Sequence, residues 1–272
     1  MPPKQFDVRA YLRRATLMED QFMSLCFNGN IPCTSAMLRH ILGREVGITR
    51  VVTQKEFRGV KRSLRLDIYA NDGRYTVYNV ETENKKKRAI PKRARYHCGM
   101  IDVNHLDKGK DFSRLPESWV IFITRHDIFG HGRTMYTINR YIEGINEPFD
   151  DGQHIIYVNC SAENDGSEVW KLIHDMKCSN PDEMFIPELA ERTRYFKEIE
   201  EGGYTMDREL ARYIREREKE AAAKAATAAA ATATASLLSA FVKAGAMTAE
   251  KIAETLGMST SEVQALIAQA RP

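Results

Sequence analysis

A β-hairpin between residues 64 and 83 is the feature that most limits how this chain can fold. Two runs with strand-like composition, residues 64–70 and 75–83, flank the turn sequence Asn71-Asp72-Gly73-Arg74. Asn, Asp and Gly favour tight turns because they tolerate the left-handed backbone that such turns require. We therefore expect the two runs to pair as antiparallel neighbours in a sheet.

Acidic residues lie on both strands of this hairpin. Asp67 is in the middle of the first strand, and Glu81 and Glu83 end the second. Alternate residues of a strand share a face, so Glu81, Glu83 and Lys85 should point the same way. Asp67 joins that face only if the residue numbers of the two members of each cross-strand pair sum to an even value. That register requires a three-residue loop containing Gly73, or a bulge, whereas a two-residue turn would separate the acids.

In the even register, Asp67 and Glu81 become diagonal cross-strand neighbours, roughly 7–8 Å apart at the backbone. Two carboxylates at that range can hold one Mg²⁺ or Mn²⁺ ion, since hard cations prefer oxygen ligands. A metal beside a phosphodiester polarises the phosphoryl oxygen and lowers the pKa of a bound water that attacks in line. Lys85, or Glu83 as a further ligand, would complete such a catalytic site.

A run of cations follows these acids. Most charge runs are solvated loops, but this one directly adjoins two carboxylates. We expect it to bind the phosphates of a nucleic acid through sequence-independent, salt-sensitive contacts. Because the net charge is only +3, nucleic-acid affinity must come from such a local patch. The expected DNA-binding residues are Lys85, Lys86, Lys87, Arg88, Lys92, Arg93 and Arg95.

The rest of the first two hundred residues predicts an α/β fold, a mixed sheet flanked by helices. Apolar spacing predicts helical structure over residues 11–42, interrupted at residues 28–32, and helices over residues 92–105, 167–177 and 187–199. Further strands are expected at residues 46–54, 119–124, 135–141 and 154–158. His126 and His131 bracket a segment that we interpret as a loop rather than a metal site.

The composition changes after residue 205. Residues 207–244 contain no Gly or Pro and are rich in Ala, which predicts a long helix that acts as a spacer. The tail predicts two short helices, with Thr248 as an N-cap, Gly257 as a C-cap and a capping box from Ser259 to Glu262. We expect three parts, residues 1–205, 206–245 and 246–272.

The tail allows two interpretations. Ala253, Gly257 and Val263 have the spacing of a helix-turn-helix, but the second helix offers only Gln264 and Gln269 for reading bases. A unit for homo-oligomerisation or protein docking at the end of a long helix is equally consistent with the sequence.

The five cysteines are odd in number, widely spaced and contain no C-x-x-C, so we expect reduced, packed thiols. The first residues lack the apolar core of a signal peptide, and no apolar run is long enough to cross a bilayer. We therefore expect a cytoplasmic protein with no membrane partner.

The order of these motifs resembles the PD-(D/E)XK nuclease superfamily and, within it, the bacterial recombination-promoting, transposase-like nucleases. The resemblance covers most of the first two hundred residues. It implies a restriction-endonuclease-like fold and a Mg²⁺-dependent DNA endonuclease, with Asp67 and Glu81 as metal ligands and Glu19 as a further acid on the opening helix. The segments that carry it are Met18-Glu19-Asp20-Gln21-Phe22-Met23, Leu66-Asp67-Ile68, Gly73, Tyr78-Asn79-Val80-Glu81-Thr82-Glu83, Arg93-Ala94-Arg95-Tyr96-His97 and residues 119–124.

Glu83 departs from the pattern of this family. The superfamily has Lys at this position and the transposase-like branch usually has Gln, whereas a glutamate cannot supply positive charge. Either Glu83 binds metal while Lys85 supplies the cation, or the site is catalytically impaired. Two other hypotheses therefore stand beside the endonuclease: a DNA-binding protein that no longer cleaves, and an interaction protein that works through its Ala-rich helix and tail.

Overall fold

The computed structural model describes residues 8–59, 61–86, 88–198, 248–256 and 259–269, together with a few helical residues between 215 and 230. The chain divides into two compact units. One is Val8–Asp207, and the other consists of Met1–Asp7 and Arg208–Pro272. The expected three-part division, with a separate spacer over residues 206–245, remains a prediction.

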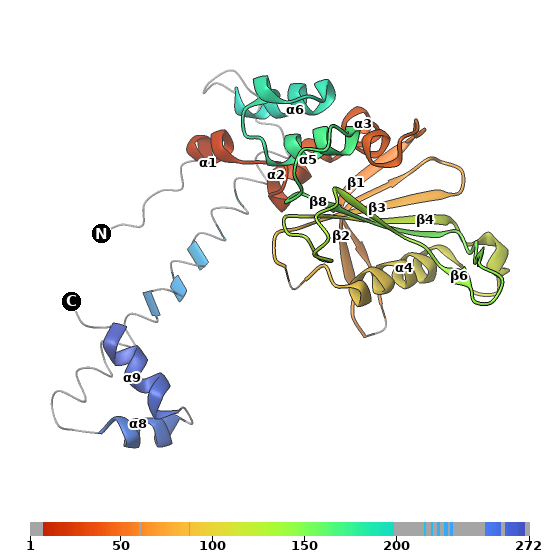
Figure 1. The fold of residues 1–272 in the computed structure, drawn as a ribbon. Helices are drawn as coiled ribbons and strands as arrows, with labels where there is room; N and C mark the ends of the chain where they lie inside the picture. The colour runs from red at the N-terminus through yellow and green to blue at the C-terminus, as the bar shows by residue number, and fades with distance from the viewer. Residues whose placement is uncertain are drawn as a thin grey trace. The chain divides into compact units, whose positions relative to one another are not determined.

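A six-stranded mixed sheet forms the centre of the larger unit (Figure 1). Its order is β1-β2-β3-β4-β8-β5. β3, β4 and β8 are parallel, and the other neighbours are antiparallel. The expected α/β class and mixed sheet are confirmed. The strands are β1 Arg50–Phe57, β2 Leu64–Asn71, β3 Thr76–Glu83, β4 Glu117–Thr124, β5 Met135–Ile138 and β8 Gln153–Asn159.

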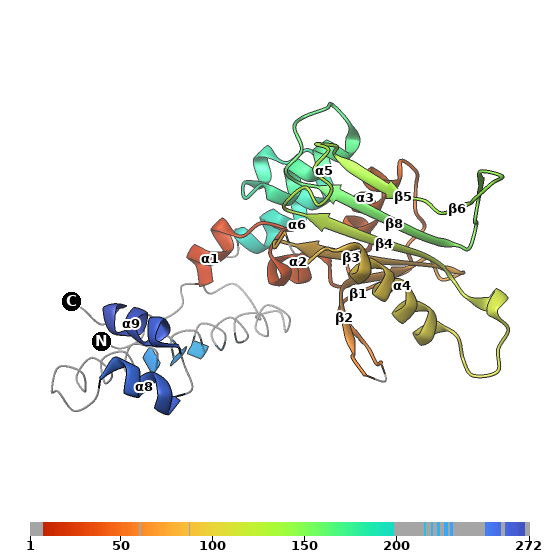
Figure 2. The same cartoon turned by 60° about the horizontal axis from the view of Figure 1, so that its bottom comes forward.

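Helices cover both faces of this sheet (Figures 1 and 2). α4 lies along one face, and α2, α3, α5 and α6 lie on the other. The α-helices of this unit are α1 Val8–Arg14, α2 Asp20–Phe27, α3 Ile31–Leu42, α4 Pro91–His105, α5 Glu168–Lys177 and α6 Pro187–Lys197. Short 3₁₀ turns lie at η1 Phe112–Arg114 and η2 Pro181–Glu183, and a small separate hairpin joins β6 Tyr141–Ile142 to β7 Glu147–Pro148.

The apolar run of β4 is buried on both sides. Val120, Ile121, Phe122 and Ile123 are each fully buried, because helices pack against both faces of the central strand. Val120 and Phe122 belong to the core beneath α4, which also includes Tyr157. Burying each such side chain stabilises the fold by about 1.5–3 kcal/mol, so β4 holds the two layers of helices to one sheet.

The hairpin between β2 and β3 has the register that the acids require. Ile68 pairs with Val80 and Asn71 with Val77, so the numbers of paired residues add up to 148, an even value. The N–H of Asp72 donates to the Thr76 carbonyl, which leaves the three-residue loop 73–75. Gly73 adopts a φ of 72° in this loop. Of the alternatives that the sequence left open, the three-residue loop with Gly73 inside it is the one observed, and the condition for Asp67 and Glu81 to share a face is met.

Three boundaries differ from expectation. The stretch before residue 28 contains two helices, α1 and α2, because Leu17 and Met18 turn into the core between them and are fully buried. β1 begins later than predicted, at Arg50. The strand expected at 135–141 ends at Ile138, because the chain then leaves the sheet for the β6–β7 hairpin.

The described part of the second unit contains α8 Ala249–Leu256 and α9 Thr260–Gln269, as the sequence predicts. The N-H of Glu262 bonds the Ser259 hydroxyl, and the N–H of Ser259 bonds the Glu262 carboxylate, which confirms the capping box. The N-cap at Thr248 is present as well. The predictions for Gly257 and for most of residues 207–244 lie outside the described residues.

All five cysteines are free thiols, as expected. His126 and His131 lie in the connection between β4 and β5, which agrees with the loop interpretation. None of the helices in the described part of the chain combines the length and the apolar character needed to span a bilayer.

Replacement of Gly73 tests the hairpin loop. A Cβ at this position would lie 2.8 Å from the Thr49 hydroxyl oxygen, on a left-handed backbone that alanine disfavours. We expect Gly73→Ala to lower the free energy of unfolding by about 1–2 kcal/mol in urea titrations. Gly99→Ala is the matched control, because an added Cβ inside α4 meets open space and should stabilise the helix by about 1 kcal/mol. Equal effects of the two substitutions would contradict the strained loop.

Candidate functional site

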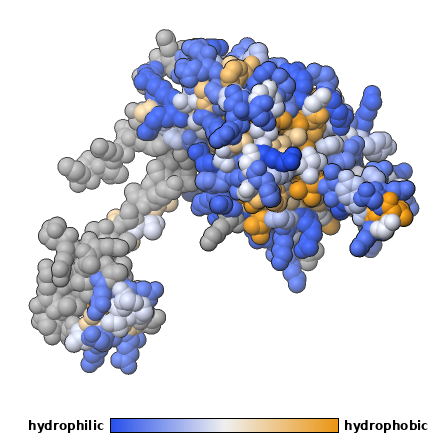
Figure 3. Space-filling model, in the orientation of Figure 1, coloured by the Kyte–Doolittle hydropathy of each residue, from blue (hydrophilic) through white to orange (hydrophobic). Residues whose placement is uncertain are grey.

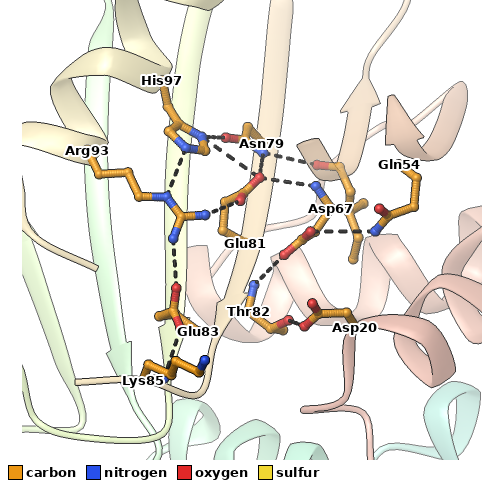
Figure 4. A network of polar contacts seen from close by, with 11 residues as sticks. Asp20, Gln54, Asp67, Asn79, Glu81, Thr82, Glu83, Lys85, Arg93 and His97 are labelled. Atoms are coloured by element: carbon orange, nitrogen blue, oxygen red, sulfur yellow. Dashed lines mark hydrogen bonds and ion pairs between the residues drawn. The ribbon is translucent and has the colours of Figure 1, made fainter. Parts of the chain in front are cut away.

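The candidate site lies where β2 and β3 separate. Their backbone pairing ends at Ile68 and Val80. Beyond that point, side-chain carboxylates accept the backbone N–H groups that a carbonyl of the neighbouring strand would otherwise accept (Figure 4). The N–H of Asp67 donates to Glu81 Oε1 at 3.1 Å, and the N–H of Thr82 donates to Asp67 Oδ2 at 3.1 Å. Extending the register places Asp67 directly opposite Glu81, so the diagonal arrangement expected from the sequence is wrong.

Arg93 of α4 binds both glutamates of β3. Its guanidinium donates to Glu81 Oε2 at 3.0 Å and to Glu83 Oε2 at 2.7 Å (Figure 4). Only 1% of the Glu81 side chain is exposed, against 31% of the Arg93 side chain. A buried carboxylate needs a paired charge and hydrogen bonds to offset its desolvation, and Arg93 supplies the charge.

His97 and Asn79 complete a closed set of hydrogen bonds around Glu81. The Asn79 amide donates to Glu81 Oε1 at 2.8 Å, so its oxygen faces His97 Nδ1, also at 2.8 Å. His97 is therefore assigned as the neutral Nδ1–H tautomer, whose Nε2 accepts from Arg93 Nε at 3.3 Å. Burial and the neighbouring Arg93 lower the pKa of His97 to about 3, which keeps the ring neutral. The ring thus fixes the orientation of the guanidinium.

Phe122 forms the apolar base of this arrangement. The Arg93 guanidinium lies 5.3 Å from the Phe122 ring centroid, and the His97 ring packs edge-on against the same ring at 5.3 Å. Phe122 pairs with Glu81 in the parallel ladder between β3 and β4, so the strand register brings the aromatic ring to the acid. A cation over an aromatic face is stabilised by the ring quadrupole.

Asp67 is less well neutralised than Glu81. Gln54, which has a left-handed φ of 55°, offers its amide to Asp67 at a long 3.5 Å. Burial, and then the negative charge of Asp20, raise the pKa of Asp67. Burial and the adjacent Asp67 likewise raise the pKa of Glu81. Both carboxyls of the pair therefore bind protons more readily than ordinary carboxyls, because two adjacent negative charges repel each other away from water.

This donor set fits a hard divalent cation. Mg²⁺ is bound in proteins through one or two carboxylates plus waters, and Asp67 and Glu81 are two adjacent carboxylates that repel each other. Asp20 is a further acid beside this pair. Its carboxylate accepts from the Thr82 hydroxyl at 3.4 Å, and its negative charge contributes to the raised pKa of Asp67. Within the described ranges, no cluster of three or more His, Cys, Asp or Glu side chains is already arranged to surround a metal.

The acid contributed by the N-terminal helices is Asp20 rather than Glu19 in this arrangement. Glu19 precedes α2, and its carboxylate accepts from the Tyr11 hydroxyl and from the Thr16 N–H. Asp20 begins α2 and contacts Thr82 beside Asp67. The two acids are adjacent in sequence, and only the position of the helix start distinguishes them. The proposed metal contact of Glu19 stays a prediction without support from these contacts.

Lys85 does not share the face of Glu81 and Glu83. β3 ends at Glu83, and Lys85 lies in the following turn, where its N–H donates to Glu83 Oε1 at 2.8 Å and its side chain is exposed. The strand alternation expected through Lys85 is therefore wrong. Arg93, predicted to bind phosphate, is instead the cation paired with both glutamates.

The other predicted phosphate ligands surround the start of α4 as exposed side chains. No acidic residue occurs between Glu83 and Asp102 in the sequence, so the charged residues of this segment are all basic apart from its two ends. The described members are Lys85, Lys86, Arg88, Lys92 and Arg95, while Lys87 lies outside the described residues.

The sequence did not identify Arg93, His97, Asn79 or Asp20 in these roles. One signal was present: Arg93, His97 and Ile101 are spaced four apart in α4, so a cation and a histidine share the face that Ile101 buries in the core. A cation on a buried helix face requires a buried acid as its partner.

Three comparisons with known proteins gave no match: no family model matches the sequence, and neither the curated proteins nor the solved structures searched contain a significant relative.

The pH dependence of stability in an Asp67 variant tests whether folding raises the pKa values of Asp67 and Glu81. A carboxyl whose pKa is raised by folding stabilises the protein below the ordinary carboxyl range, and that contribution is lost as pH rises through the folded pKa. The wild type should therefore lose stability between pH 5 and pH 8. Asp67→Asn removes one titrating group and lowers the pKa of Glu81. Between the same two pH values the variant should lose less free energy of unfolding than the wild type. The difference should be about 1.4 kcal/mol for each unit of pKa shift that the substitution removes, measured by urea titration in the presence of EDTA.

Asp72→Asn is the matched control in the same hairpin. Although burial acts to raise its pKa, hydrogen bonds from the Thr76 and Arg74 N–H groups lower the pKa of Asp72 overall. Asp72 is thus charged at both pH 5 and pH 8, and its substitution should change stability equally at both. A stability curve for Asp67→Asn parallel to the wild type would contradict the raised pKa of the buried pair.

Proposed function

We propose that this protein is a metal-dependent DNA endonuclease of the PD-(D/E)XK type, similar to the recombination-promoting, transposase-like nucleases. The observation that carries the proposal is the carboxylate pair of Asp67, which is partly buried, and Glu81, which is fully buried, facing each other where β2 and β3 separate. The proposal is also supported by the mixed sheet, because parallel strands deliver functional residues at their carboxyl ends.

Asp67 and Glu81 would hold Mg²⁺ or Mn²⁺ through their carboxylate oxygens. When bound, the metal supplies Lewis-acid polarisation of the phosphoryl oxygen and a water of lowered pKa. Asn79 and the Asp67 N–H orient the Glu81 carboxylate through Oε1, and Gln54 and the Thr82 N–H orient Asp67. The exposed cations at the start of α4 hold the DNA backbone beside the acids.

Arg93 favours a second candidate function, DNA binding without cleavage. Its guanidinium already neutralises Glu81 and Glu83 without a metal, so the acids have a structural role available to them. In this alternative the Glu at position 83 co-operates with Arg93 to stabilise the fold, and the basic surface alone carries the activity. Cleavage and metal binding distinguish the two candidates.

Cleavage of supercoiled plasmid with Mg²⁺ or Mn²⁺ tests the first candidate. We expect nicking by the full chain, loss with EDTA, and a decrease of at least about 100-fold in Asp67→Asn and Glu81→Gln, because each removes a metal ligand. Glu19→Gln should retain most activity, since Glu19 bonds Tyr11 and Thr16 instead. Absence of metal-dependent nicking, with DNA binding retained, would replace the endonuclease by the second candidate.

Metal binding by an Arg93 variant tests how the guanidinium and a metal share the acids. Arg93 and a divalent cation compete for Glu81 Oε2, so Arg93→Gln should bind Mn²⁺ about tenfold more tightly, equivalent to about 1.4 kcal/mol. Calorimetric titration of the full chain measures this affinity. His97→Gln is a suitable comparison, because it perturbs the orientation of Arg93 while leaving its charge. Unchanged Mn²⁺ affinity in Arg93→Gln would contradict the competition between the guanidinium and the metal, and absence of Mn²⁺ binding in the wild type and in both variants would argue that the acids are only structural.

A further inference from the structure

The loop between β1 and β2 carries a second concentration of positive charge. Residues 58–65 contain four cations and no acidic residue. The side chains of all four, Arg58, Lys61, Arg62 and Arg65, are exposed. The hairpin loop forms a hydrophilic projection at the lower edge of the surface in Figure 3. An exposed run of like charges is unfavourable in isolation, so its concentration on one projecting hairpin calls for a functional explanation.

α4 holds this loop in place. The Tyr96 hydroxyl donates to the Arg62 carbonyl at 2.6 Å, and Gly59 lies so close to the same carbonyl that a Cβ would be 2.3 Å from its oxygen. The hairpin therefore runs beside α4 in the fold (Figure 1). Arg95, an exposed cation of the α4 surface, is one residue from Tyr96, which contacts the hairpin.

The hairpin also leads directly to the acids. Arg65 is two residues before Asp67 on β2, and Lys85 and Lys86 come just after the end of β3 at Glu83. Because the two strands are antiparallel, these exposed cations lie beyond the same end of the carboxylate pair, where β2 and β3 separate. The five residue steps from Arg62 to Asp67, of which the last three lie in β2, span at most about 17 Å, at roughly 3.3 Å per step. That length corresponds to about five phosphates along one DNA strand, at about 3.4 Å per phosphate.

We propose that the β1–β2 hairpin is a second phosphate-binding arm, which contacts the backbone of duplex DNA about half a helical turn from the acids. This inference rests on the proposed function for the position of the DNA, but the binding itself does not require cleavage. A duplex fits better than an apolar partner because four exposed side chains of the arm, Arg58, Lys61, Arg62 and Arg65, are cationic and because phosphates recur at the spacing that the arm spans.

Salt-dependent DNA binding tests the arm. The full chain in EDTA, which prevents cleavage, is titrated onto a fluorescent 30-base-pair duplex over a range of NaCl concentrations. The triple variant Arg58→Gln, Lys61→Gln and Arg62→Gln should bind at least tenfold more weakly at low salt. Its slope of log affinity against log salt should fall by about 2–3, since each phosphate contact contributes about 0.9. The hairpin backbone is unaffected, because Tyr96 bonds the carbonyl of residue 62 rather than its side chain.

The matched control removes the same charge from the other end of α4. Lys108, Lys110 and Arg114 are exposed in the segment between α4 and β4, and their triple substitution by Gln should leave the salt slope close to that of the wild type. Urea titration of both triple variants verifies that each is folded. Equal losses in the two variants would show a general charge effect and overturn the arm, as would absence of duplex binding by the wild type.

The arm and the cleavage activity can fail separately. Hairpin-dependent binding without metal-dependent nicking would support the arm and overturn the endonuclease. Nicking that is lost in Asp67→Asn but unaffected by the hairpin triple variant, together with an unchanged salt slope, would support the endonuclease and overturn the arm.

Discussion

The guanidinium of Arg93 is the interaction on which the centre of this structure depends. It joins α4 to β3 through two carboxylates, and it lies over the ring of Phe122, which belongs to β4. One side chain thus ties the helix on one face of the sheet to its two central parallel strands. Since Glu81 is almost completely buried, removal of its partner would leave an uncompensated charge in the core, which typically costs about 3–5 kcal/mol.

The same arrangement explains why the two acids opposite each other differ. Glu81 has Arg93, Asn79 and a backbone N–H as partners, whereas Asp67 has one backbone N–H and a distant amide. Negative charge is therefore compensated on the α4 side of the pair and in excess near Asp20. A cation that binds from solution would gain most on the side of Asp67, where the protein provides least neutralisation.

Local physical rules predicted much of the fold and part of the site. The turn chemistry of residues 71–74 and strand periodicity predicted the hairpin, because both are properties of neighbouring residues, but they left open whether Asp67 and Glu81 share a face, and only the observed register decides it. The apolar run of β4 and the capping box at Ser259 followed from similarly local patterns. Strand ends were less predictable, and the error at Lys85 arose because β3 stops where its backbone turns to give an N–H to Glu83. The pairing of Arg93 with both glutamates depends on how α4 packs across the sheet, which no local pattern determines.

The three-residue loop at Gly73 has a consequence for how this hairpin can vary in length. Side chains alternate between the two faces of β3, so a slip of β3 by one residue against β2 and β4 would turn Glu81 and Glu83 away from Arg93 and bring Thr82 towards it. A residue gained or lost within the loop 73–75 leaves the strand pairs unchanged and keeps the acids in place. Homologues that retain the acid pair should therefore vary freely in this loop, whereas a residue gained or lost within β3 between Thr76 and Glu81 requires a compensating bulge.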